Sequence, residues 1–242
     1  MSRYVMKFGG SSVADARKMY AVARTIAATK RAGHEVVAVL SAQGGGTDAL
    51  MAKAREIDPD CGGRELDALL STGEQASVSL CAMALGRLGI PSLSLCGWQA
   101  GLETDAVHGS ARVLHLSKNR IEQELAADRV VLVAGFQGVN SEGDITTLGR
   151  GGSDTTAVAL AAFLHADRCQ IFTDVDGVYD KDPRKYADAV KFDTITYDDM
   201  LTLARSGAKV LHDRCVELAK KYGVPVEVRS SFSAASGTLV RA

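Results

Sequence analysis

The sequence predicts an α/β protein, a three-layer sandwich in which a mostly parallel central sheet carries helices on both faces. Short, continuously apolar runs such as residues 36–40 and 130–136 are typical of strands that are buried on both faces. Longer segments with apolar residues at helical spacing separate these runs. Strands that alternate with helices in this way form parallel sheets through crossover connections.

The expected elements follow in chain order. We expect strands at residues 3–8, 36–40, 92–95, 130–136, 169–173, 224–229 and 238–240, and a small hairpin over 140–147 around Gly143. We expect helices over residues 13–27, 49–57, 74–88, 117–127, 155–165, 197–205 and 210–222. Gly33 fits the end of the first helix, and the Gly89-Ile90-Pro91 run ends the third.

Composition and charge exclude several classes of protein. The 242 residues are 46% hydrophobic and carry a net charge of −1, so we expect neither nucleic acid nor a membrane as partner. No window approaches the roughly 20 apolar residues of a membrane span, and the N-terminus lacks the apolar core of a signal peptide. The five cysteines are widely spaced without a CxxC pair, which favours reduced thiols in the cytoplasm over disulfides or zinc.

Glycine-rich turns follow several of the predicted strands, after Phe8, Leu40 and Thr173. In parallel sheets the ligand crevice lies beyond the carboxyl ends of the strands. The turns therefore predict one binding site at that edge of the sheet.

The first turn has the properties of an anion site. Gly9 and Gly10 permit close backbone approach, the following helix offers amides, and Lys7 supplies a point charge that suits a phosphoryl group. It is not a P-loop, in which the lysine follows the glycines. The alternative is a surface lysine beside an ordinary helix cap.

A second glycine turn, GRGGSD, places Arg150 and Asp154 around the start of a helix. A dinucleotide-binding turn is excluded, because Asp154 stands where its third glycine belongs and would repel a pyrophosphate. The guanidinium of Arg150 matches a carboxylate with two hydrogen bonds. The alternative is a loop capped by Ser153 or Asp154.

The acidic segment TDVDGVYDKDPR, residues 173–184, does not match a calcium-binding loop. Counted from Asp174, the twelfth position is Lys185, where such a loop requires glutamate. The segment suits a nucleotide loop in which Tyr179 covers the base or ribose and Arg184 reaches phosphates. A solvated acidic loop is the alternative.

These motifs together resemble the aspartate kinases of the amino-acid kinase superfamily. The resemblance is carried by KFGGSSV, LLSTGEQ, GWQAG, TDAVHG, GRGGSDTTA, TDVDGVYDKDPR and GAKVLH, in family order along nearly the whole chain. It implies the amino-acid kinase fold, with residues 1–242 as one catalytic domain and no ACT regulatory domain in this chain. It also implies transfer of the γ-phosphoryl group of ATP, with Mg²⁺, to the side-chain carboxylate of L-aspartate, the first step towards lysine, threonine and methionine.

The resemblance also implies roles for individual residues. Substrate binding falls to Ser41, Thr47, Glu74, Arg150 and Ser153, with Glu74 meeting the ammonium group and Arg150 a carboxylate of aspartate. ATP binding falls to Lys7, Gly9, Gly10, Thr173, Asp174, Tyr179, Arg184 and Lys209. The catalytic residues are Lys7, Asp154 and Lys209, and no metal ligand is assigned. Because the substrate carboxylate is ionised at neutral pH, we expect Asp154 to hold Lys7 or Lys209 rather than to remove a proton.

Two departures and two rival functions complete the expectations. The chain stops about where an ACT module begins in the family, so any feedback inhibition must come from a separate regulatory chain or another site. The resemblance also implies a homodimer. Asp213 stands where proline is common after KVLH. The rivals are another superfamily kinase, acting on acetylglutamate, glutamate or a nucleotide, and a non-catalytic amino-acid-sensing protein.

Overall fold

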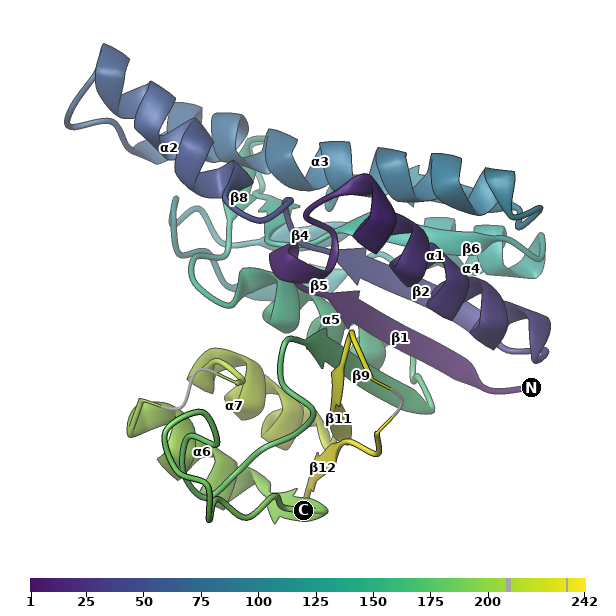
Figure 1. The fold of residues 1–242 in the computed structure, drawn as a ribbon. Helices are drawn as coiled ribbons and strands as arrows, with labels where there is room; N and C mark the ends of the chain where they lie inside the picture. The colour runs from purple at the N-terminus through teal and green to yellow at the C-terminus, as the bar shows by residue number, and fades with distance from the viewer. Residues whose placement is uncertain (208–209, 234) are drawn as a thin grey trace.

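Eight strands form the central sheet in the order β10-β12-β11-β9-β1-β2-β6-β3 (Figure 1). The computed structural model describes residues 1–207, 210–233 and 235–242. All neighbours in this sheet run parallel except β11 and β12. The strands are β1 (Arg3–Phe8), β2 (Glu35–Leu40), β3 (Ser92–Leu95), β6 (Val130–Ala134), β9 (Arg168–Thr173), β10 (Thr194–Thr196), β11 (Val226–Ser230) and β12 (Thr238–Arg241). The predicted mostly parallel sheet is confirmed.

Helices cover both faces of the sheet and complete the three layers (Figure 1). They are α1 (Ala16–Arg31), α2 (Gly46–Ile57), α3 (Gly63–Arg87), α4 (Asn119–Ala126), α5 (Gly152–Phe163), α6 (Tyr197–Arg205) and α7 (Asp213–Tyr222). A 3-10 turn, η1 (Gly10–Ser12), precedes α1. Within the described ranges no helix combines the length and apolar character that crossing a membrane requires.

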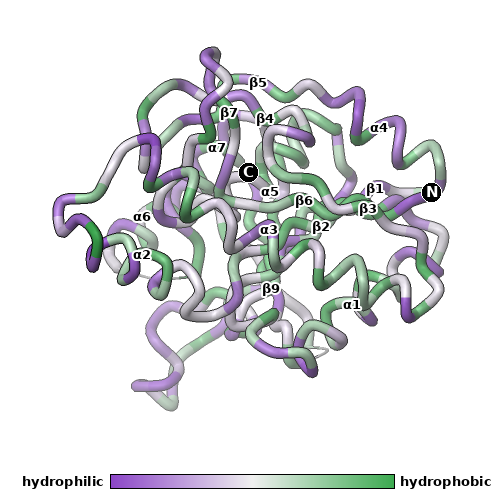
Figure 2. Tube along the Cα trace, turned by 90° about the horizontal axis from the view of Figure 1, so that it is seen from above, coloured by the Kyte–Doolittle hydropathy of each residue, from purple (hydrophilic) through white to green (hydrophobic). Residues whose placement is uncertain are grey.

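Strand alternation in β1 divides the core in two. Met6 and Phe8 belong to the cluster under α1 and α3, whereas Val5 belongs to the cluster under α5 and α7. Alternate side chains of a strand share a face, so Lys7 points to the same side as Val5, towards α5. Figure 2 shows the hydrophobic residues gathered in the central strands and α5, with hydrophilic residues in the outlying loops.

A second, four-stranded sheet with the order β5-β4-β7-β8 lies beside the large one. Its strands are β4 (Leu102–Thr104), β5 (Val113–Leu116), β7 (Gln137–Val139) and β8 (Ile145–Thr147). Strands β7 and β8 pair antiparallel around Gly143, as the predicted hairpin requires. Strands β4, β5 and β10 contain only three or four residues each and were not predicted from the sequence.

The largest error in the expected elements concerns α3, which begins at Gly63, eleven residues before the expected start at Glu74. The first turns bury Asp67, Leu70 and Ser71, and so a long helix is stabilised by tertiary contacts that no local pattern reveals. Helix α1 begins at Ala16 instead of Val13, because the Asp15 side chain accepts a hydrogen bond from the Lys18 amide.

Candidate active site

The carboxyl ends of β1 and β2 bring two glycine turns together. Phe8 pairs with Leu40 at the ends of these strands, and the turns beyond are joined by a hydrogen bond from the Gly44 amide to the Gly10 carbonyl, 3.0 Å long. A Cβ atom on Gly10 would lie 2.7 Å from the Ala42 carbonyl oxygen. Glycine is therefore required at position 10 by the approach of the second turn.

Lys7 and Asp154 meet in the space between β1 and α5. Lys7 Nζ lies 2.6 Å from Asp154 Oδ1, and the two side chains are only 11% and 13% exposed. The contact is an ion pair without the angles of a hydrogen bond, and Oδ1 is buried with no hydrogen-bond partner among the described residues. A buried, closely paired lysine is held in a fixed position, ready to meet an anion.

The GRGG turn leads directly into α5. Gly149 and Gly151 have φ angles of 74° and 70°, and at Gly151 an added Cβ would collide with the side chain of His212. Gly151 is the N-cap of α5 and no side chain caps the helix, so the capping alternative for Ser153 or Asp154 is wrong. Asp154 lies in the first turn instead, where the helix dipole favours negative charge.

Arg150 stands between these two glycines with its side chain exposed. With the described residues it makes no hydrogen bond and no ion pair, and its glycine neighbours line the cavity where Arg150 itself does not. The structure therefore does not bring Arg150 into the cavity with the other residues expected to bind the substrate.

Glu74 forms the opposite wall, on α3. It is 3% exposed, and its Oε1 accepts a hydrogen bond of 3.0 Å from the Ala42 amide. Its Oε2 is buried without a hydrogen-bond partner among the described residues. Burial raises the pKa of Glu74 from 4.5 to about 7, outweighing the Ala42 hydrogen bond, which lowers it. An unsatisfied buried carboxylate oxygen beside a cavity is a binding group for a cation.

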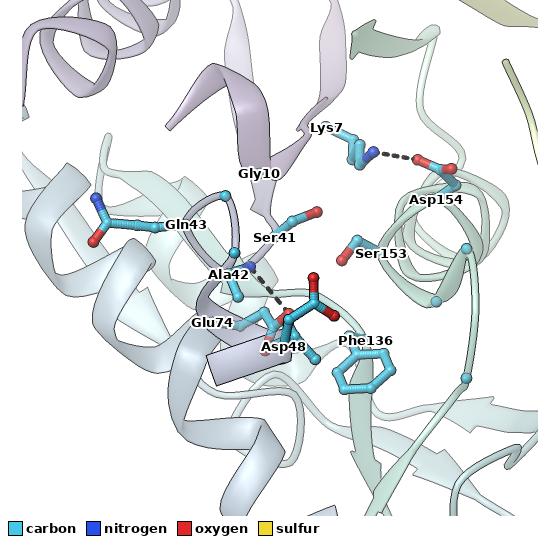
Figure 3. Close-up of a pocket in the computed structure, with 16 residues that line it drawn as sticks. Lys7, Gly10, Ser41, Ala42, Gln43, Asp48, Glu74, Phe136, Ser153 and Asp154 are labelled. Atoms are coloured by element: carbon cyan, nitrogen blue, oxygen red, sulfur yellow. Dashed lines mark hydrogen bonds and ion pairs between the residues drawn. The ribbon is translucent and has the colours of Figure 1, made fainter. Parts of the chain in front are cut away.

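One cavity of about 370 Å³ connects these groups. It brings together Lys7, Gly10, Ser41, Thr47, Glu74, Ser153 and Asp154 from the expected set. Figure 3 shows Lys7 and Asp154 on one side and Glu74 on the other, with Ser41 and Ser153 between them. Of the described residues that line it, Lys7 is basic and Asp48, Glu74 and Asp154 are acidic. The cavity therefore suits a ligand that carries both negative and positive charge.

Only some of the residues expected to bind nucleotide lie at a second cavity, of about 630 Å³, since Lys7 and Gly10 line the first one. Tyr179 and Arg184 line the second cavity, and the Tyr179 hydroxyl donates a 2.9 Å hydrogen bond to Asp176, which raises the pKa of the phenol. Thr173 ends β9 and donates to Asp174 at 3.1 Å, but neither residue lines either cavity. Gly9 donates its amide to the Phe172 carbonyl at 3.3 Å. The expected site residue Lys209 lies outside the described residues.

The first cavity, beside Lys7 and Glu74, is also lined by residues that the sequence did not predict, among them Gln43, Asp48 and Phe136. Asp48 follows Thr47 directly and the glycine turn could have indicated it. Phe136 has a φ of 71°, a conformation that is unusual for a bulky residue and recurs at functional sites. No local sequence pattern predicts this conformation of Phe136.

A family model described as the amino acid kinase family matches residues 2–230 of the chain. The chain belongs to the amino acid kinase family. The predicted fold is confirmed by a solved structure, an aspartate kinase from Synechocystis, with a TM-score of 0.89 and 46% identity, covering 100% of this chain and 40% of that one.

Two further relatives carry the same name. The chain is 50% identical to aspartokinase 2 of Bacillus subtilis (strain 168) over 240 residues, 99% of this chain and 59% of the relative. The structure of E. coli aspartokinase III in complex with aspartate and ADP has a TM-score of 0.87 and 30% identity, covering 98% of this chain and 64% of that one. The chain therefore spans less than two thirds of the length of these amino acid kinases.

Proposed function

We propose that the chain is the catalytic part of an aspartate kinase, which transfers the γ-phosphoryl group of ATP to the side-chain carboxylate of L-aspartate. The observation that carries the proposal is the single cavity with the Lys7–Asp154 ion pair on one wall and the unsatisfied Glu74 carboxylate on the other. The relatives named aspartokinase support it, and one of their structures is described as a complex with aspartate and ADP.

The charges of aspartate match the groups around the cavity. The ammonium group pairs with Glu74, whose buried Oε2 lacks a partner among the described residues, and a carboxylate pairs with the exposed guanidinium of Arg150. Ser41, Thr47 and Ser153 offer hydroxyl groups between these charges. N-acetylglutamate has no ammonium group, so Glu74 disfavours it as the substrate and favours a free amino acid.

The reaction joins two anions. One side-chain carboxylate oxygen of aspartate attacks the γ-phosphorus, the bond from that phosphorus to the bridging oxygen breaks, and ADP leaves with the electron pair. Lys7 neutralises charge on the transferring group. The attacking carboxylate has an unperturbed pKa of about 3.9, so no base is needed. Asp154 therefore acts by holding the Lys7 ammonium in place.

The nucleotide extends from Lys7, Gly9 and Gly10 towards the second cavity. Its phosphates meet Lys7 and the backbone of the first glycine turn, and the family resemblance also assigns Arg184 and Lys209 to nucleotide binding. Its base or ribose lies against Tyr179, and Thr173 and Asp174 contact it at the end of β9.

Mg²⁺ fits this arrangement as an ion that arrives on ATP. It binds through substrate phosphates with one or two carboxylates, and the described residues contain no group of three His, Cys, Asp or Glu side chains placed to hold a metal. Asp154 is already paired with Lys7, so we assign no protein ligand to the ion. Bound to the ATP phosphates, it would supply positive charge to the phosphoryl oxygens. We further propose a cytoplasmic homodimer that serves lysine, threonine and methionine synthesis.

A hydroxylamine trapping assay tests the function. The chain is incubated with ATP, Mg²⁺ and L-aspartate, L-glutamate, N-acetyl-L-glutamate or UMP, while ADP and hydroxamate are measured separately. We expect hydroxamate with L-aspartate alone, and its loss in Lys7→Met. ADP formation with another acceptor would assign a different kinase. Calorimetric binding of aspartate without turnover would assign a sensing protein.

A further inference from the structure

The backbone just before the GRGG turn is held by a buried carboxylate on α3. Asp67 is 1% exposed. Its oxygens accept hydrogen bonds from the Thr147 amide at 2.9 Å and the Thr147 hydroxyl at 2.5 Å. The same carboxylate accepts from the Gly109 amide at 3.0 Å and contacts His108 Nδ1 at 2.9 Å. Asp67 thus joins two loops, at Thr147 and at residues 108–109.

An arginine on α7 holds the same two loops from the other side. Arg214 Nη1 donates to the Leu148 carbonyl at 2.6 Å. Its Nη2 donates to the Ala111 carbonyl at 2.7 Å, and a longer contact of 3.4 Å reaches Ser110. The planar fork of arginine is suited to bridging two carbonyl groups in fixed relative positions.

Two consecutive residues just before the turn are therefore held at backbone groups of opposite polarity. Thr147 gives its N–H to a carboxylate, and Leu148 gives its C=O to a guanidinium. The loops are also joined to each other, since the Ala111 amide donates to the Thr147 carbonyl at 2.9 Å. The residue after Leu148, Gly149, lines the cavity, and the exposed Arg150 follows it.

Neither Asp67 nor Arg214 lines the cavity. Both can influence it only indirectly, through the backbone that they hold before the GRGG turn. Asp67 lies seven residues before Glu74 on α3, and positions i and i+7 share one face of a helix. One rigid helix thereby sets both the Glu74 wall and the start of the GRGG turn. Burying a carboxylate is costly unless it is fully hydrogen-bonded, and here four hydrogen-bonded contacts offset the cost.

We propose that Asp67 and Arg214 are positioning residues that together fix the GRGG turn and so set the affinity for the carboxylate-bearing substrate. The identity of that substrate as aspartate rests on the proposed function. The nucleotide side of the site belongs to β1, β9 and the loop after β9, which these residues do not touch.

The test compares Asp67→Asn, Arg214→Ala, Arg214→Lys and the double variant with matched controls. Asp167→Asn removes a carboxylate that accepts the Arg3 amide at 2.6 Å, and Arg31→Ala removes a guanidinium that donates to the Leu88 carbonyl at 2.7 Å. Arg31 ends α1 and Asp167 directly precedes β9, so both controls lie at the end of the sheet opposite the carboxyl ends of the strands. Thermal unfolding of each variant is measured first, so that only folded proteins are compared.

We expect KM for aspartate to rise about 10- to 100-fold in Asp67→Asn and Arg214→Ala, the range for lost hydrogen bonds to a charged group. KM for ATP stays within about twofold of wild type, Arg214→Lys lies between, and the double variant falls short of the product of the singles because both act on one turn. Equal rises in both KM values, or an unchanged KM for aspartate in a folded variant, would overturn the proposal.

A second readout is independent of the substrate. Amide hydrogen exchange at Thr147 and Gly109 should accelerate in Asp67→Asn and remain unchanged in Asp167→Asn. If wild type phosphorylates no aspartate, the proposed function fails while the exchange data still decide whether the turn is held. Unchanged exchange in Asp67→Asn overturns the positioning role even if aspartate is the substrate.

Discussion

Replacing Glu74 by glutamine should make the stability of the protein relative to wild type increase with pH, while it abolishes aspartate binding. Glu74 is buried and its pKa is raised from 4.5 to about 7. The folded state therefore holds this proton more tightly than the unfolded state. The stability associated with it is complete below pH 4.5 and is lost as the pH rises to about 7.

The magnitude follows from the shift. A difference of about 2.5 pKa units corresponds to about 3 kcal/mol of lost stability above pH 7. At about pH 5 only about 1 kcal/mol of it has been lost. Glutamine never ionises, so the stability of Glu74→Gln relative to wild type should improve by about 2 kcal/mol between pH 5 and pH 8. A buried, unpaired amide costs about 1–3 kcal/mol at every pH.

Urea denaturation without ligands, at about pH 5, 6, 7 and 8, measures this relative stability. Glu122→Gln is the control, because the hydrogen bond from Arg3 lowers the pKa of Glu122. Its contribution is lost only as the pH falls below 4.5. The control should therefore show a deficit that is constant over this range. A constant difference between Glu74→Gln and wild type from pH 5 to pH 8 would refute the reasoning.

Three further outcomes follow from the same geometry. Lys7→Met and Asp154→Asn should each lower kcat. For Lys7 the expected loss is about 100- to 1000-fold, which is typical for one group that stabilises transition-state charge. Near-normal turnover of Asp154→Asn in the hydroxamate assay would contradict the role of Asp154. Gly10→Ala should destabilise the protein by about 1–3 kcal/mol in urea, because its Cβ meets the Ala42 carbonyl at 2.7 Å. Gly86→Ala, with open space around it, should not destabilise. KM for aspartate should rise as the pH falls below about 7, because Glu74 takes up a proton there. A KM that does not change between pH 6 and 8 would show that Glu74 does not bind the ammonium group.

Much of the fold and part of the site could be predicted because both follow from strand geometry. Continuous apolar runs predicted the parallel sheet, and parallel strands end at one edge, which brought the glycine turns after Phe8 and Leu40 together. Alternation along β1 also places Lys7 on the α5 face, where Asp154 lies. These are short-range regularities that the sequence expresses directly.

What could not be predicted depends on contacts between distant segments. The early start of α3 at Gly63 and the burial of the Asp67 carboxylate depend on contacts with β8 and the loop after β4, which are distant in the sequence. The left-handed Phe136 has no local signal, since a bulky residue is rarely expected at positive φ.

Isotope transfer from substrate to phosphate tests the central claim most directly, namely that Lys7 and Glu74 bring a carboxylate of aspartate to the phosphorus of ATP. The chain is supplied with ATP, Mg²⁺ and L-aspartate whose side-chain carboxyl carries oxygen-18, and hydroxylamine releases the phosphate for mass spectrometry. Attack by the carboxylate predicts phosphate that contains one oxygen-18 atom. Phosphate without the label, released at the same rate as ADP, would mean that water is the acceptor and would contradict the account.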